Sequence, residues 1–275
     1  LLHAIGLRFL GESVLGHRLL ETLCHGLLIF RLFVVRGPVA AGSFRERLSA
    51  LAQPLPPPSA RFGIEWGALE LGGERLHGAL ADGLEAGIKT AWERSLSQLS
   101  RAGAQIVEIP LLEINALPGL LATGGFSAAE SYTWHRHLLA KGESKYDPRV
   151  AARILKGANM KAFEYLDLHK GRAEWIQRMQ AALNQFDAAI SPTVPVYSPT
   201  IDSVAPGQER DEAFFHVNGL LLRNTSVVNM LDGCALSLPM HVAGELPSSL
   251  MVWQGPMHDD AVLNISLTIE DALRA

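Results

Sequence analysis

Residues 214–241 read FFHVNGLLLRNTSVVNMLDGCALSLPMH, and after a turn residues 248–256 read SSLMVWQGP. The first part predicts a helix from Phe214 to Leu231 that ends at Gly233, because glycine readily adopts the backbone conformation that closes a helix. The apolar runs Leu236–Met240 and Ser249–Trp253 predict a pair of strands. This succession of a helix and two strands indicates that the C-terminal third of the chain belongs to an α/β fold.

A strand, a helix and a second strand are predicted further upstream. Ala60–Ile64 is predicted to be a short strand. From Gly78 to Ala102, apolar residues keep the three- and four-residue spacing of an amphipathic helix, which we expect to end at Gly103. The alternation in Gln105–Pro110 predicts the second strand, so the three elements form a βαβ-type unit.

Helices are predicted to dominate the middle of the chain. Phe126–Lys141 and Lys161–Phe186 are predicted helices, and Asp147-Pro148-Arg149 begins a shorter one. A short strand, Ala188–Ser191, leads into a loop rich in proline. Asp259 or Asp260 is predicted to cap the last helix, which has an apolar face of Val262, Ile265, Ile269 and Leu273. These elements indicate an α/β fold with a mixed β-sheet flanked by helices.

The composition indicates a globular protein and excludes several functions. The chain has 275 residues, 48% of them hydrophobic, and a formal net charge of −4. Lysine and arginine are scattered, so nothing indicates a nucleic-acid partner. Two cysteines, Cys24 and Cys234, do not form a disulfide framework in a chain of this size, and we expect a reducing, cytoplasmic setting. We expect no membrane-spanning segment and no membrane partner.

Residues 1–59 have a composition unlike the rest. Residues 1–60 contain six arginines and three histidines but no Lys, Asp, Asn, Tyr or Trp. Three interpretations compete: an organelle transit peptide, a transmembrane helix, and a damaged stretch translated out of frame. Arg8, Arg18 and Arg31 interrupt every apolar window of about 20 residues, which argues against the second interpretation, and we favour the third. The stiff run Gln53–Pro58 marks the boundary to a domain formed by residues 60–275.

Common motifs of metal and cofactor chemistry are not present. The sequence has no His-Glu-x-x-His, no Cys-x-x-Cys, no phosphate-binding glycine loop with lysine, and no Gly-x-Ser-x-Gly. His135 and His137 are two residues apart on a predicted helix, so their side chains point in different directions. We therefore expect neither a metal site nor a cofactor.

Several runs together resemble the C-terminal part of amidase signature family hydrolases. The resemblance covers Ala60 to Ala275 and is strongest from Gly124 onward, and the runs occur in the family's order. They are Tyr146–Ile154, Phe186–Pro195, Leu221–Ser226 and Gly244–Pro256. Within the family, the resemblance is to bacterial amidases acting on small amides or urea-like compounds rather than to the larger tRNA amidotransferase component. It implies the amidase signature fold and hydrolysis of an amide bond by a serine, a second serine and a lysine.

The catalytic Ser-Ser-Lys triad that the resemblance implies is not found in this sequence. The family's Gly/Ser-rich run is missing, and Gly124-Gly125-Phe126-Ser127 resembles a later segment in which Ser127 caps a helix or lies in its first turn. All six lysines lie on predicted exposed helices or turns, whereas a lysine base needs a desolvated site. We therefore predict no catalytic residue, and a chain that is a fragment, inactive alone and prone to self-association through exposed apolar surface. The alternative is a non-catalytic remnant or pseudoenzyme that serves as a binding module.

Three residues are predicted to contact a small amide substrate if the site is completed. Thr193 lies in the proline-bordered loop and resembles a family position that lines the active site; alternatively its hydroxyl satisfies local backbone groups. Tyr132 and His135 share one face of a helix that shapes the substrate pocket in the family; alternatively they pack with their polar ends in solvent. Arg223 pairs with a carboxylate, either of a ligand or within the protein.

Overall fold

The computed structural model describes residues 61–64, 69–71, 74–76 and 80–274 in two compact units. The helical unit comprises Ala116–Ala173. The sheet unit comprises the described residues up to Asn115 together with those from Glu174 onward. Each unit is described separately below. The predicted atypical segment 1–59 lies outside the described residues.

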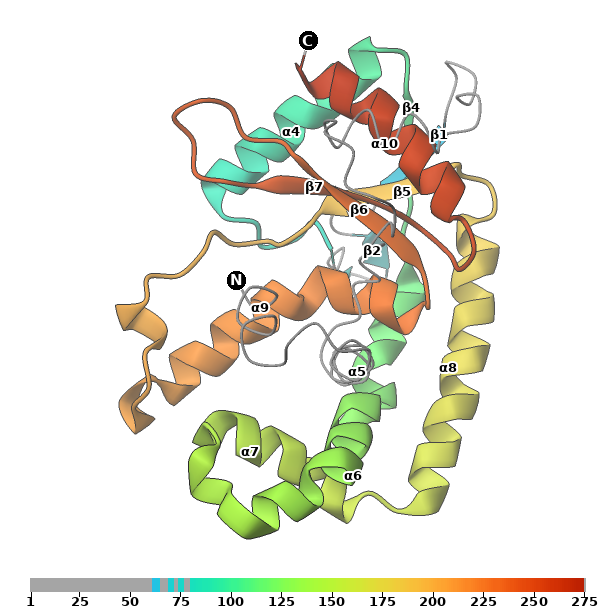
Figure 1. Cartoon of the computed structure of the whole chain (residues 1–275). Helices are drawn as coiled ribbons and strands as arrows, with labels where there is room; N and C mark the ends of the chain where they lie inside the picture. The colour runs from blue at the N-terminus through green and yellow to red at the C-terminus, as the bar shows by residue number, and fades with distance from the viewer. Residues whose placement is uncertain (1–60, 65–68, 72–73, 77–79, 275) are drawn as a thin grey trace, which may run out of the picture. The chain divides into compact units, whose positions relative to one another are not determined.

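The sheet unit contains a mixed five-stranded sheet in the order β4-β1-β5-β7-β6, as predicted (Figure 1). The central strand β5 pairs in parallel with β1, which pairs in parallel with β4, and β7 is antiparallel to both β5 and β6. The strand bounds are β1 Arg61–Ile64, β4 Gln105–Glu108, β5 Ala188–Pro192, β6 Cys234–Pro239 and β7 Ser249–Gln254. An antiparallel hairpin of β2 Leu69–Leu71 and β3 Glu74–Leu76 was not predicted.

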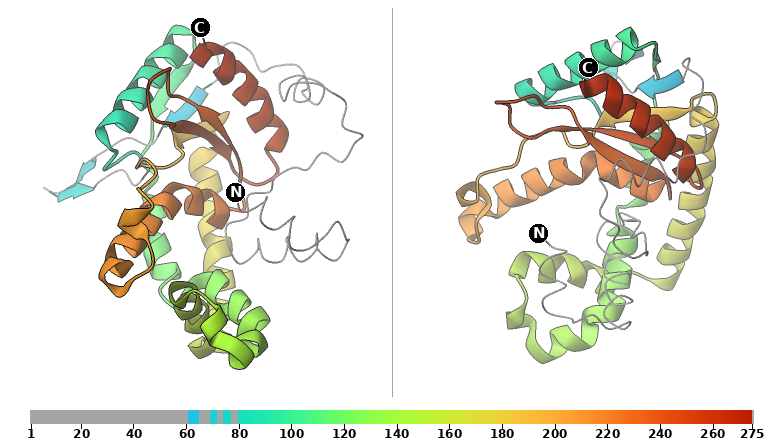
Figure 2. Two further views of the ribbon diagram at one scale, coloured as in Figure 1. Left: turned by 60° about the vertical axis from the view of Figure 1, so that its left-hand side comes forward. Right: turned by 45° about the horizontal axis from the view of Figure 1, so that its top comes forward.

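Helices α4 (Ala86–Arg101) and α10 (Asp259–Arg274) cover one face of this sheet (Figure 2). Their apolar stripes meet alternate residues of the strands, because side chains in a strand point to opposite faces in turn. Ile190 of β5 and Val252 of β7 are paired in register and both face this core. The other buried members include Ile88, Trp92, Leu99, Leu250, Val262, Ile265 and Ile269. The amphipathic pattern therefore predicted both helices correctly.

Helix α4 begins at Ala86, eight residues later than predicted. Gly83 has a φ of +59°, and the Asp82 carboxylate accepts its N–H, so the chain turns here instead of continuing a helix. Leu80 precedes this turn and is fully buried although it lies outside the helix. The apolar spacing thus identified a buried residue but placed it in the wrong element.

Helix α9 (Asp211–Met230) lies on the opposite face of the sheet from α4 and α10 (Figure 1). Met251 and Trp253 of β7 alternate with the residues of the first core, so they point to this second face, and each is 1% exposed. Because β5 and β7 are covered on both sides, every residue of β5 and nearly every residue of β7 is buried. Gly233, as predicted, follows the end of α9.

The helical unit contains the helices predicted for the middle of the chain. In α7, the Asp147 side chain accepts the N–H of Arg149 at 2.8 Å, and Pro148 occupies the first helical position. Helix α8 begins in this unit and continues into the sheet unit, ending at Leu183 rather than Phe186. The bounds are α5 Leu117–Leu120, α6 Gly125–Gly142, α7 Pro148–Leu155 and α8 Ala162–Leu183.

Short 3-10 helices link the longer elements: η1 Leu112–Ala116, η2 Glu143–Lys145, η3 Lys156–Asn159, η4 Asp202–Val204 and η5 Gln208–Arg210. None of the helices in the described part of the chain has both the length and the apolar character needed to cross a membrane.

Candidate active site

Four strands of the sheet point their carboxyl ends toward the same edge. β1 and β4 run parallel to β5, and β6 also runs in the direction of β5 because β7 is antiparallel to both. In open α/β sheets, ligands bind beyond the carboxyl ends of the strands. Thr193 directly follows Pro192, the last residue of β5. The predicted substrate-contacting residue therefore lies at the edge where a ligand is expected.

Thr193 is partly exposed, and its hydroxyl is paired with a second hydroxyl. Its N–H donates to the Ser249 carbonyl at 2.9 Å, which continues the ladder between β5 and β7. Its Oγ1 lies 2.7 Å from Oγ of Ser237 on β6. The Thr193 hydroxyl therefore contacts a side chain from another strand. Ser237, which supplies that side chain, is exposed.

Asn224 of α9 fixes the start of the loop that carries Thr193. Its side chain is fully buried, and its Nδ2 donates to the carbonyls of Pro192 at 2.7 Å and Leu80 at 2.8 Å. Arg223 donates from Nε to Asn224 Oδ1 at 3.0 Å and from Nη2 to the Leu80 carbonyl at 3.1 Å. A buried amide that uses its donors and its acceptor in this way ties three segments together.

Glu85 holds the far end of the same loop, which we call the proline loop (residues 192–197). Its N–H donates to the Pro195 carbonyl at 2.9 Å, and its carboxylate accepts the N–H of Tyr197 at 2.8 Å. The Tyr197 ring lies close to Gly87, where any Cβ would come within 2.5 Å of its hydroxyl. Both ends of the proline loop are therefore held by hydrogen bonds, so the Thr193 position is set before any ligand arrives.

Tyr132 and His135 lie in the helical unit, where Tyr132 packs on the small core and His135 contacts Tyr146, which packs on the same core. The Nδ1 atom of His135 lies 2.8 Å from the Tyr146 hydroxyl, and the two rings meet edge to face at 5.7 Å. Burial lowers the pKa of His135, which favours its neutral form. Tyr132 packs on the cluster of Leu139, Ala151 and Ile154 and remains partly exposed. The shared helix face was predicted, but the Tyr146 contact was not.

The three predicted substrate-contacting residues thus belong to two units, Thr193 to the sheet unit and Tyr132 with His135 to the helical unit. Sequence reasoning missed Ser237 and Asn224. The alternation of residues along the predicted strand indicates that Ser237 faces away from the core. The signal for Asn224 was its place in the run Leu221–Ser226, directly after Arg223. The register between the strands was not known, and no local sequence pattern determines it.

Among the described residues, no lysine has the desolvated position that a base in serine catalysis needs. All six lysines of the chain are described and all are exposed: Lys89, Lys141, Lys145, Lys156, Lys161 and Lys170. Ser127 is an exposed first-turn residue of α6, as predicted, and Gly124, not Ser127, occupies the N-cap. In the described part of the chain, no three His, Cys, Asp or Glu side chains are grouped to hold a metal ion. Burial raises the pKa of Cys234 to about 11, which makes it a poor nucleophile.

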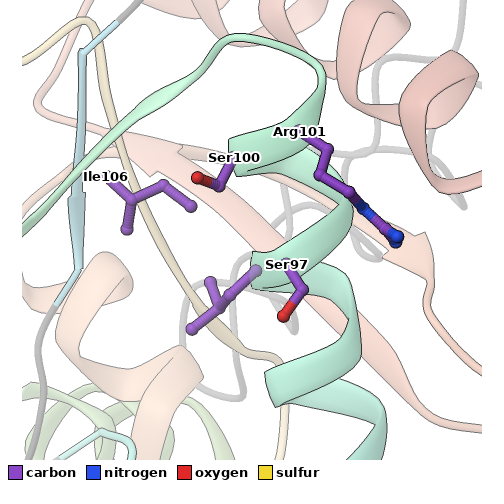
Figure 3. Close-up of a pocket in the computed structure, with 5 residues that line it drawn as sticks. Ser97, Ser100, Arg101 and Ile106 are labelled. Carbon is purple, nitrogen blue, oxygen red and sulfur yellow. The ribbon is translucent and has the colours of Figure 1, made fainter.

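A shallow pocket of about 540 Å³ lies between α4 and β4 (Figure 3). It is lined by Leu96, Ser97, Ser100, Arg101 and Ile106. Because the end of α4 leads directly into β4, these residues lie at the amino end of that strand. β4 runs in the same direction as β5, so the pocket and Thr193 are at opposite edges of the sheet. The pocket contains no carboxylate, histidine or lysine and has no evident catalytic group.

The described residues form an α/β fold with a mixed sheet and a polar edge at Thr193. Residues 74–263 match the Amidase family. The chain therefore belongs to the amidase family, as the sequence runs predicted.

Two curated relatives are similar to the chain. It is 28% identical over 195 residues to 2-amino-5-chloromuconic acid deaminase of Comamonas testosteroni, a match that covers 69% of this chain and 40% of that protein. It is 24% identical over 216 residues to a glutamyl-tRNA(Gln) amidotransferase chain of Salinispora arenicola, covering 70% and 43%. The chain thus spans about two fifths of the length of the curated relatives it matches.

Solved structures share the fold. The allophanate hydrolase of Kluyveromyces lactis superposes with a TM-score of 0.64 at 22% identity, over 80% of this chain and 32% of that one. The 6-aminohexanoate cyclic dimer hydrolase in complex with its substrate gives a TM-score of 0.62 at 14% identity, over 86% and 49%. At these identities the likeness establishes the amidase signature fold that the sequence predicted.

Proposed function

We propose that the chain is the C-terminal part of an amidase that hydrolyses a carbon–nitrogen bond in a small-molecule amide. The observation that carries this proposal is the match of residues 74–263 to the Amidase family. The relative from Comamonas testosteroni is named as a deaminase of a small organic acid, which supports a small substrate. In the complete enzyme, a serine attacks the amide carbon, an acyl-enzyme forms, the amine or ammonia leaves, and water releases the acid.

Thr193, Tyr132 and His135 are the residues we propose to contact the substrate. Thr193 supports this role by its place beyond the end of β5 and by its partly exposed hydroxyl. His135, with its pKa lowered by burial, offers a neutral ring, and Tyr132 adds a partly exposed aromatic surface. We further propose a cytoplasmic setting and no nucleic-acid partner, supported by the partly buried free thiol of Cys234 and the mildly acidic composition.

We also propose that this chain does not turn over amides by itself and that binding is what it does alone. A lysine base requires a desolvated site in which its neutral form is populated. Each of the six lysines is exposed, so none has such a site within the described residues. This observation also favours the second candidate function, a binding or interaction module without catalysis.

The test is ammonia release from acetamide and benzamide by the purified full chain, combined with binding of benzamide measured by ligand-observed NMR. We expect binding without ammonia release. Clear turnover that is lost when one lysine is replaced by methionine would overturn the proposed absence of a base. A chain that neither binds nor hydrolyses any small amide would overturn the amidase proposal and leave the interaction module.

A further inference from the structure

We infer that Ser237 of β6, together with Thr193, forms a two-hydroxyl site that recognises the amide group of the ligand and discriminates it from a ketone or ester. This inference rests on the proposed function and names a specificity-determining residue for it. The starting observation is the 2.7 Å distance between Thr193 Oγ1 and Ser237 Oγ, which joins the end of β5 to β6 across the intervening strand β7.

The chemistry of two paired hydroxyls matches an amide. One hydroxyl donates its proton to the other, so the pair keeps one free O–H donor and unshared lone pairs on both oxygens. An amide presents a C=O acceptor and an N–H donor side by side, so it can accept from and donate to the pair simultaneously. A ketone or an ester offers only the acceptor. The pair therefore makes two contacts with an amide and one with its analogues that lack the N–H.

The location and exposure of the two hydroxyls permit such contacts. Thr193 is partly exposed and Ser237 is exposed, and both lie near the strand ends where ligands bind in α/β sheets. The positions are also held in advance. Asn224 fixes the Pro192 carbonyl, and the Thr193 N–H is bonded to the Ser249 carbonyl, so little ordering is needed on binding.

A third hydroxyl on the same sheet face points to a polar occupant. Ser191 and Ser237 both align with Met251 in the register of β5, β7 and β6, so all three project to one side. Thr193, two residues beyond Ser191, projects to that side as well. Ser191 is 1% exposed, and its Oγ has no hydrogen-bond partner among the described residues. Buried hydroxyls are nearly always bonded, so this corner of the sheet has unused hydrogen-bonding capacity.

The experiment measures the affinity of the full chain for benzamide and for acetophenone, which has similar size but no N–H, by ligand-observed NMR titration. Ser237→Ala is expected to weaken benzamide about 5- to 10-fold, the effect of losing one hydrogen bond, and acetophenone less than about 2-fold. Thr193→Val should do the same. Ser237→Thr, which restores a hydroxyl and suits a strand, should recover most of the benzamide affinity.

The matched control is Ser198→Ala, which removes an exposed serine just beyond the proline loop and should leave both affinities unchanged. Because Ser237 is exposed on a strand at the end of the described sheet, its replacement should shift the unfolding midpoint by less than about 2 °C, so a loss of affinity cannot be a loss of fold. Equal affinity of wild type and Ser237→Ala for benzamide overturns the inference alone. Failure of the wild type to bind benzamide overturns the proposed function with it.

Discussion

Replacing Asn224 by alanine should destabilise the sheet unit by about 2–4 kcal/mol. The side chain is fully buried and donates to the carbonyls of Pro192 and Leu80. After the substitution, the Leu80 carbonyl keeps its bond from Arg223, but Pro192 loses its Asn224 donor. A buried polar group left unsatisfied costs about 1–3 kcal/mol, and the space left by the amide adds to this. For a chain of this length, the expected fall in the unfolding midpoint is roughly 3–7 °C.

The assay is urea and thermal unfolding followed by circular dichroism, with Asn218→Ala as the matched control. Asn218 is on the same helix but is partly exposed, so its loss should cost less than about 0.5 kcal/mol. Hydrogen exchange adds a local readout. In Asn224→Ala, the backbone amides of the peptide that covers Thr193 and Tyr197 should exchange faster than in the wild type, and this increase should be larger than the increase in α10. Equal stability of the two alanine variants would refute the role of Asn224 in holding the start of the proline loop. Amide exchange in the proline loop that is no faster than in the wild type would refute it as well.

Three further outcomes are expected. In a Cys24→Ser background, the single thiol of Cys234 should react with iodoacetamide at pH 8 on the order of 100-fold more slowly in the folded than in the urea-unfolded protein, because its pKa is raised to about 11; equal rates would contradict its burial. The Arg94 guanidinium, which donates to both oxygens of Glu245 at 2.7 Å, is the main cause that lowers the pKa of Glu245 from 4.5 to about 2. Since the pKa of Glu245 is depressed in the folded protein, this carboxylate stabilises the fold above pH 4.5 and loses that contribution as the pH falls toward 2. The difference in urea midpoint between the wild type and Glu245→Gln should therefore shrink over this range. A constant difference would contradict the pairing with Arg94. Trp134 and Leu138 lie one turn apart on α6 with 46% and 52% of their surface exposed, and replacing both by glutamine should reduce the binding of an apolar dye and any self-association seen by analytical ultracentrifugation; unchanged values would exclude this surface as the site of association.

Local patterns predicted the elements well where the packing is simple. The strands β5 and β7 were predicted within one residue because an unbroken apolar run between turns has few alternatives. Helix α10 was predicted with Asp259 or Asp260 as its cap, and the structure places both residues inside its first turn. The prediction failed at the start of α4 for two reasons. The Asp82–Gly83 turn interrupts the helix, although the apolar spacing continues through it. Glu85 is also bonded to Pro195, more than 100 residues away, and that contact is not visible in the local spacing.

The candidate site was predictable only in part for the same reason. Thr193 was predicted because it lies in a proline-bordered loop after a strand and resembles a family position that lines the active site; its contact with a substrate stays a prediction. Ser237 was not predicted, because its contact with Thr193 depends on the register of β5, β7 and β6, and the two residues are 44 positions apart in the sequence. Asn224 was missed because nothing in the sequence reveals that its amide meets the carbonyls of Leu80 and Pro192. Local signals therefore identify polar positions, and the sheet decides which of them meet.

Binding and catalysis are separable in this chain, and that separation decides between its two proposed functions. An interaction that holds the substrate equally in its ground and transition states lowers the substrate concentration needed but does not accelerate the chemical step. The contacts proposed for the Thr193–Ser237 pair are made with the amide of the intact ligand, so they support binding and supply neither a nucleophile nor a base. Acceleration needs an activated hydroxyl with a proton acceptor, and the exposed lysines supply no desolvated acceptor. A chain that binds amides but has no activated hydroxyl with a proton acceptor releases its ligands unchanged. An ammonia assay alone would not distinguish such a chain from a protein that does not bind amides, so the binding measurement is needed beside it.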